Sequence, residues 1–182
     1  IRYNILYMDG QFRSHLESKT YQTKYRQEFI TITPDVELAI KNSGVKRGSI
    51  LVQTHHTTCG LWVNENEKNL IGPTEEIGYT SDLRHVLDNF ASPMHDYGHN
   101  DIRHGENVNG KRNTHLCEPD ENGVIHECVN GHAHAQALMI HPFVNFIVED
   151  GRILKGRWQE IMLVELDHDR PRTVSFLVSG VK

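Results

Sequence analysis

A polar, histidine-rich stretch interrupts the chain and constrains its fold more than any other feature. Eight of the thirteen histidines lie between positions 95 and 141, and residues 97–131 show almost no periodic apolar pattern. A loop this long is unusual inside a compact domain and is commonly functional. A second group, His55 and His56, lies upstream. Because imidazole is both the commonest metal ligand and the usual proton shuttle near neutral pH, the two groups predict one site, although His-rich loops can also be merely polar and exposed.

The composition indicates one globular domain over residues 1–182. Of these residues 37% are apolar and 24% charged, and no repeat or linker divides them. The net charge of −5 argues against a nucleic-acid partner. No apolar run reaches the roughly eighteen residues of a membrane helix, so no membrane partner is expected. Three cysteines fit a reducing compartment, and we expect the cytosol. The start at Ile1 shows no signal-peptide pattern, and the native N-terminus before it is left open.

The apolar patterns outside the polar stretch predict a mainly β protein with two or three helices. Strands are expected over residues 21–32, 49–56, 60–64, 143–148, 158–166 and 173–179. One helix is expected to have Thr33 as N-cap and Pro34 at its first position, and to end at Gly44. A second follows Ser81, and its buried face comprises Leu83, Val86, Leu87 and Phe90. A short third helix is expected over residues 133–138.

Backbone geometry limits which neighbouring histidines can share a pocket. Consecutive side chains on a strand point to opposite faces, so His55 and His56 cannot both face one site. On a helix, His132 and His134 would diverge by about 200°, so only one of them would reach a shared metal. His95 and His99 have the i, i+4 spacing of a helical ligand pair, although a nearby proline and glycine disfavour a helix there.

Cysteines and carboxylates offer further candidates. Two His-X-Cys units, with His115 and Cys117 in one and His126 and Cys128 in the other, could supply zinc ligands. Their spacing is not a standard zinc pattern, so we favour polar loop residues with two part-buried thiols. Cys59 is expected to pack as a small apolar residue.

The end of the 60–64 strand carries Asn64 and Glu65. A carboxylate there could take a proton, bind a metal or orient an imidazole, although a lone Glu is more often a surface residue. Trp158, which is followed by Gln159, is expected to be a buried aromatic that opens a strand.

These residues carry a family resemblance. The segment H-T-T-C-G-L-W-V-N-E-N (56–66) resembles the His-Thr-Thr/Ser … Asn-Glu signature of the YjbQ-like family, often called secondary thiamine-phosphate synthases. Y-G-H (97–99), N-G-H-A-H (130–134) and G-R-I-L-K-G-R-W-Q (151–159) resemble further family elements, in order, within a likeness that runs from about residue 29 to 180. The chain departs from the family at H-P-F (141–143), in the long loop, and at Arg157, where Thr is common.

The resemblance implies an α+β protein with antiparallel sheets in a sandwich or jelly-roll-like arrangement, and a homotrimer. It also implies a divalent-metal site on His56, His99 and His134, which takes one residue from each neighbouring pair. We expect zinc, with magnesium as the alternative for a diphosphate substrate. A three-His site leaves coordination positions open for water or substrate oxygen, as catalytic metals do.

The activity implied by the resemblance is the coupling of hydroxymethylpyrimidine diphosphate to thiazole phosphate with release of pyrophosphate. In that reaction Glu65 is expected to act as a base or orienter, while Asn64 hydrogen-bonds substrate. The further substrate-binding candidates are Thr57, Thr58, His132, Arg157 and Gln159, with Lys155 as a second supporting cation. Two alternatives stay open: a metal-dependent hydrolase with Glu65 as general base, and a non-catalytic trimeric metal-binding protein.

Overall fold

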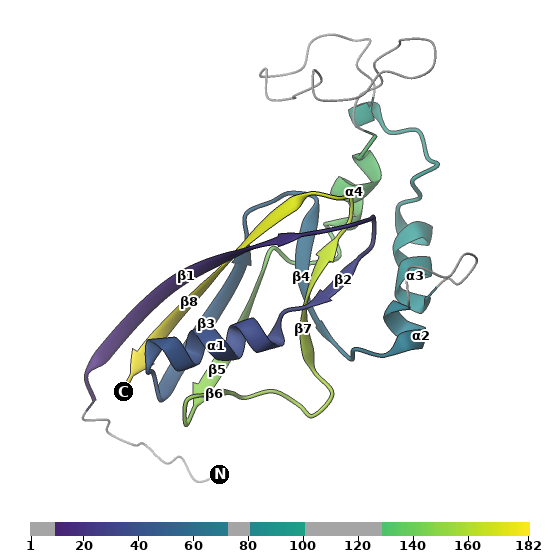
Figure 1. The fold of residues 1–182 in the computed structure, drawn as a ribbon. Helices are drawn as coiled ribbons and strands as arrows, with labels where there is room; N and C mark the ends of the chain where they lie inside the picture. The colour runs from purple at the N-terminus through teal and green to yellow at the C-terminus, as the bar shows by residue number, and fades with distance from the viewer. Residues whose placement is uncertain (1–9, 73–80, 101–128) are drawn as a thin grey trace, which may run out of the picture.

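The chain folds into two antiparallel sheets with helices, which confirms the α+β class (Figure 1). The computed structural model describes residues 10–72, 81–100 and 129–182. Its elements are β1 (Phe12–Gln22), β2 (Phe29–Thr31), α1 (Thr33–Ser43), β3 (Arg47–Thr54), β4 (Cys59–Asn64), α2 (Lys68–Ile71), α3 (Asp82–Phe90), the 3₁₀ turn η1 (Gly98–Asn100), α4 (Gly131–Gln136), β5 (Phe143–Glu149), β6 (Arg152–Ile153), β7 (Glu160–Glu165) and β8 (Pro171–Val181).

The larger sheet has the strand order β1-β8-β3-β5-β6, and the smaller has the order β2-β7-β4. Alternation along β8 explains the larger sheet, because Val174, Phe176 and Val178 are buried while the residues between them are partly exposed. β1 pairs with β8 along its whole length, from Phe12 opposite Val181 onward.

Two clusters of side chains, one on each face, position the smaller sheet. One face of β7 presents Ile161 and Leu163 to the main core, which also includes residues of α1 and of the larger sheet. The other face presents Val164 and Leu166 to a second cluster, which α3 and α4 help to form. Each fully buried side chain of this kind stabilises the fold by about 1.5–3 kcal/mol. Burial on both faces explains why β7 is apolar without alternation.

Helix α1 confirms its prediction apart from the cap. Pro34 lies in the first turn, and Gly44 ends the helix with a φ of 68°, a left-handed conformation that suits glycine. Thr33 was predicted as the N-cap, but Ile32 occupies that position. The Thr33 hydroxyl instead accepts a hydrogen bond from Ile161 N at 2.9 Å, so a tertiary contact with β7 outweighs the local capping preference.

Four further predictions about the elements need correction. The predicted 21–32 strand is two strands, since β1 ends at Gln22 and β2 starts at Phe29. A fourth helix, α2, forms because the Glu67 carboxylate accepts hydrogen bonds from two backbone N–H groups at its start. On α3 only Leu87 is buried, whereas Val86 and Phe90 are about half exposed.

The fourth correction concerns Trp158, which is 62% exposed rather than buried. Strand β7 starts two residues later, because a turn precedes it in which Gly156 N donates to Gln159 Oε1 at 2.6 Å. Arg157 lies over the Trp158 ring at 4.7 Å from its centroid. In the parts of the chain that the structure describes, no helix is both long and apolar enough to cross a membrane.

Candidate functional site

The turn between β3 and β4 carries the first histidine pair. Because β3 ends at Thr54, both histidines lie beyond the strand, yet their side chains have different partners. His55 Nε2 lies 2.8 Å from Ser175 Oγ, and His56 Nε2 accepts the backbone N–H of Thr173 at 2.8 Å. Burial lowers the pKa of His56, and the positive charge of Arg172 lowers it further.

The hydrogen bond to His56 limits what this ring can bind. A neutral imidazole has one ring nitrogen with a free lone pair. In this structure that nitrogen is Nε2, whose lone pair accepts the Thr173 N–H. To bind a metal, the His56 ring would therefore have to give up this contact.

A buried ion pair lies directly behind the turn. Glu165 at the end of β7 and Arg172 at the start of β8 have side chains that are 0% and 3% exposed. Arg172 Nε and Nη2 each donate to a Glu165 oxygen at 2.5 Å, and Nη2 also donates to Thr58 Oγ1 at 3.0 Å. Burial by itself would lower the pKa of Arg172, but the hydrogen bonds and charge of Glu165 outweigh it and raise this pKa. Thr58 is buried and bound to Arg172, whereas Thr57 is exposed.

The same corner of the molecule holds the start of α4. Asp167, which is 6% exposed, accepts a hydrogen bond from Asn130 Nδ2 at 3.2 Å. It also forms an ion pair with Arg170 at 2.8 Å. Gly131 follows Asn130, and its N–H donates to Asn100 Oδ1 at 2.9 Å. A Cβ on Gly131 would lie 2.5 Å from Tyr97 Cβ, so only glycine permits this approach.

That close approach brings two predicted ligands together. The rings of His99 on η1 and His134 on α4 lie edge to face, with centroids 4.5 Å apart. His95 packs against Tyr97 instead, at 5.2 Å, and no helix joins it to His99. His95 and His99 are therefore not a helical ligand pair, as the nearby proline and glycine predicted, because residues 96–97 are irregular and η1 starts only at Gly98.

The α4 helix separates His132 from His134, as predicted. His132 is 4% exposed, and neither of its ring nitrogens has a hydrogen-bond partner. Burial lowers the pKa of His132, and the charge of Arg26 adds to this effect. The predicted substrate contact of His132 has no support in this geometry, because the ring faces the interior.

The remaining predicted residues lie at the opposite end of β4. In the β4–β7 ladder Cys59 is opposite Glu165, and Asn64 is opposite Glu160. These two ends are about 17 Å apart at the rise of about 3.4 Å per residue of a strand. Within one chain, Asn64 and the following Glu65 therefore do not meet His56.

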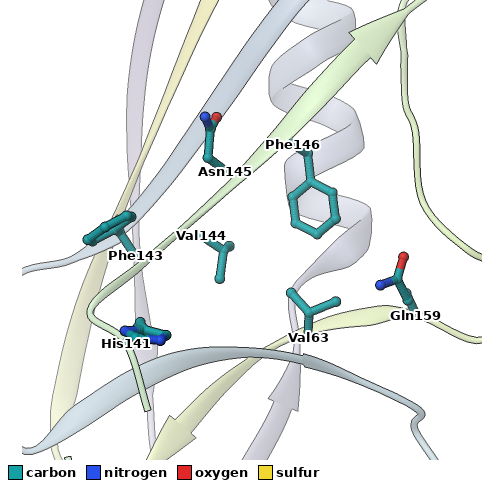
Figure 2. A pocket seen from close by; sticks show the side chains of 7 residues that line it. All are labelled: Val63, His141, Phe143, Val144, Asn145, Phe146 and Gln159. Atoms are coloured by element: carbon teal, nitrogen blue, oxygen red, sulfur yellow. The ribbon is translucent and has the colours of Figure 1, made fainter. Parts of the chain in front are cut away.

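An open cleft adjoins this second end. It has a volume of about 430 Å³ and lies between the facing edges of β4 and β5. Figure 2 shows Val144 and Phe146 of β5 facing Val63 of β4, with Gln159 at one end and His141 at the other. Gln159, which lines the cleft, and Arg157, two residues before it, are both exposed and accessible to a ligand or another chain.

Some predicted candidates lie outside the described residues, and others were missed. The two His-X-Cys units fall within residues 101–128. Cys59 is buried and packs in the main core, as predicted, and burial raises its pKa. Sequence reasoning overlooked Glu165 and Arg172, although a charged residue that ends an apolar strand is a recognisable signal.

The donor set partly fits a divalent metal. His99 and His134 are adjacent, and imidazole suits zinc. Within residues 10–72, 81–100 and 129–182, however, no three His, Cys, Asp or Glu side chains are placed together to hold a metal ion. His99 and His134 are therefore two adjacent candidate ligands. The third candidate, His56, accepts a hydrogen bond from the backbone of β8.

Comparison with other proteins identifies the family. Residues 17–181 match the family described as UPF0047 protein YjbQ-like. The chain is 26% identical to UPF0047 protein YugU of Bacillus subtilis over 170 residues, which is 91% of this chain and 99% of that one. It is 29% identical to a UPF0047 protein of Archaeoglobus fulgidus over 155 residues, covering 85% and 94% of the two chains.

Solved structures agree with this result. A hypothetical protein from Aeropyrum pernix K1 superposes with a TM-score of 0.68 at 26% identity, covering 91% of this chain and 98% of that one. A YbjQ-like protein of unknown function from Sulfolobus solfataricus P2 also gives 0.68, at 24% identity and with 93% and 99% coverage, and shows the same fold. The chain therefore belongs to the YjbQ-like UPF0047 family.

Proposed function

We propose that this protein is a metal-dependent enzyme acting on a phosphorylated small molecule, with His56, His99 and His134 as the metal ligands. The observation that supports it best is the 4.5 Å approach of His99 and His134, two residues far apart in the sequence. The reaction class proposed is that implied by the resemblance, in which hydroxymethylpyrimidine diphosphate couples to thiazole phosphate and pyrophosphate leaves. A reducing cytosolic location fits the free, buried thiol of Cys59.

In the proposed reaction, different residues of the chain have different roles. A bound divalent ion would supply neutralisation of the leaving phosphate oxygens. Arg157 has an exposed guanidinium over Trp158 and is the proposed supporting cation. Lys155 is less available, because its Nζ donates to Gln159 O at 2.8 Å and pairs with Glu160 at 3.2 Å. Glu65 is the proposed base, and its carboxylate makes no hydrogen bond or ion pair to another described residue.

The separation along β4 suggests how the proposed site is completed. We propose a homotrimer in which Asn64, Glu65 and Gln159 of one protomer face the histidines of the next. A cyclic trimer joins two different patches of the subunit surface. Exposed apolar side chains of the described residues suit such contacts, including Phe12 and Leu16 on β1, Phe90 at the end of α3 and Leu138 just after α4.

Elemental analysis tests the metal site. Purified protein is expected to hold one divalent ion per chain, and His134→Ala or His56→Ala should abolish it. His85→Ala, an exposed histidine on α3, is the matched control and should keep the metal. Unchanged metal content in both site variants would remove the site.

The assay for activity follows pyrophosphate release with and without thiazole phosphate. Release that depends on the thiazole supports the coupling reaction, whereas release without it identifies the hydrolase. No turnover with full metal content would identify a non-catalytic metal-binding protein.

Mixing of two variant subunits tests whether the site is shared between protomers. Light scattering measures whether the protein has the mass of a trimer. Glu65→Gln and His134→Ala are each expected to be inactive alone. In randomly mixed trimers about a quarter of the sites would combine an intact histidine set with an intact Glu65, so about a quarter of the activity should return. A monomer mass at micromolar concentration would overturn the trimer, and inactive mixed trimers would overturn the sharing.

A further inference from the structure

The buried ion pair between Glu165 and Arg172 is costly to form. Both side chains lose their water, and such pairs are often no more stabilising than well-packed apolar residues. By contrast, Arg47 at the start of β3 and Glu149 at the end of β5 make a similar ion pair with about a third of each side chain exposed. Fold stability alone therefore gives little reason to bury the charges of Glu165 and Arg172.

Glu165 reaches one half of the candidate site. Its Oε1 accepts the backbone N–H groups of Leu166 at 3.1 Å and Asp167 at 2.9 Å. Its Oε2 accepts the Thr23 hydroxyl at 3.0 Å. These bonds fix the chain at Asp167, whose carboxylate in turn holds Asn130 at the start of α4. The helix that carries His134 is thereby tied to Glu165.

Arg172 reaches the other half. Its Nη2 donates to Thr58 in the turn, and the N–H of the next residue, Thr173, donates to His56 Nε2. Leu166 N also donates to Thr58 O at 3.1 Å, so the two halves meet at Thr58. Every contact in this chain of bonds is buried or partly buried, where hydrogen bonds to charged groups are strong.

We infer that Glu165 and Arg172 are positioning residues that set the His56 turn against the start of α4. The inference deepens the proposed function and rests on it for the metal, because these two segments carry two of the three proposed ligands. Glu165 and Arg172 act on the ligand-bearing segments through their bonds to Thr58 and to the backbone of Asp167, and Arg172 directly precedes Thr173.

The variant that tests this is Glu165→Gln, which keeps the shape and removes the charge. In the metal-free protein, the amide of Thr173 should exchange with solvent at least about tenfold faster, and the ring nitrogen resonances of His56 should shift. The amide of Val178, further along β8, should not change. The bond from Thr173 to His56 must open before His56 can bind zinc, so the effect on zinc runs through Thr58 and Asp167, which hold the two ligand-bearing segments together. Zinc affinity, measured by chelator competition, should fall about 10–100-fold when these links are disturbed. Glu149→Gln, at the exposed ion pair, is the matched control and should alter none of these readouts.

A double variant separates positioning from stability. Glu165→Gln with Arg172→Met removes both buried charges, so the melting temperature should recover toward wild type. Zinc affinity should stay low, because the contact with Thr58 is still missing. If Glu165→Gln does not fold, Arg172→Lys keeps the charge but loses the second nitrogen, and the same shifts are expected.

Unchanged Thr173 exchange and unchanged His56 resonances in these variants would overturn the inference. Recovery of zinc affinity in the double variant would do the same, since it would reduce the pair to a structural role. If wild-type protein binds no zinc, the proposed function fails, while the exchange and resonance measurements still decide the positioning role.

Discussion

At the Cys59 end of β4 the polar groups are buried and bonded to one another, whereas at the Asn64 end they are partly or largely exposed. Glu165 and Arg172 are almost fully buried at the first end, but Gln159 and Trp158 are exposed at the second. The two ends belong to one ladder of six residue pairs, so the difference comes from what packs over each end. The buried end is suited to hold ligands in fixed positions, and the open end is suited to meet a substrate or another chain.

The largest expected effect concerns stability at the buried end. Glu165→Ala leaves the Arg172 charge buried without a partner, so it should lower the free energy of unfolding by about 3–5 kcal/mol. Glu65→Ala, at the open end, should change it by less than about 0.5 kcal/mol. Urea denaturation measures both. Equal losses would show that the two ends do not differ energetically.

The next effect concerns turnover at the open end. Glu65→Gln keeps the shape of the side chain and removes its charge, so it should reduce the rate on the order of a hundredfold, or about 2.7 kcal/mol. Its melting temperature and assembly should match wild type, because the carboxylate of the partly buried Glu65 makes no hydrogen bond or ion pair with another described residue. A wild-type rate would remove the catalytic role of Glu65 and leave the histidine site standing.

A smaller effect is the pH dependence of the buried end. Burial lowers the pKa of His132 in the folded protein, so the unfolded chain binds a proton first as the pH falls. The contribution of His132 to the free energy of unfolding is therefore complete above the unfolded pKa of about 6.5. Between that pKa and the lower folded pKa, this contribution falls by up to about 1.4 kcal/mol per pH unit. His132→Leu should flatten this slope when urea denaturation is repeated between about pH 7 and 5. An unaltered slope would assign the acid sensitivity to other groups.

The smallest effect is expected from an exposed aromatic residue. Trp158→Ala should change the free energy of unfolding by less than about 0.5 kcal/mol, because the ring is 62% exposed. Trp62, which packs against Phe29 with ring centroids 6.2 Å apart, is the control and should cost several times more. A large loss for Trp158 alone would show that another chain covers this end in solution.

Local patterns predicted several elements and one part of the site. Helix α1 follows from Pro34, its apolar stripe and Gly44, and the divergence of His132 and His134 follows from helical geometry. Most of β1, before residue 21, was missed because it alternates polar and charged residues at the edge of a sheet, where apolar periodicity is weak. Trp158 was misplaced because exposure depends on neighbours that the local sequence does not contain.

By itself, the sequence determined the strands with strong apolar patterns, the end of α1 at Gly44, and the residue types available to a site. These features depend on a few adjacent residues and their backbone preferences. Only the tertiary structure decided that His99 meets His134, that Glu165 holds Arg172 behind the His56 turn, and that Glu65 lies at the far end of β4. Such relations arise from the pairing register and packing of segments far apart in the chain, which no local pattern records.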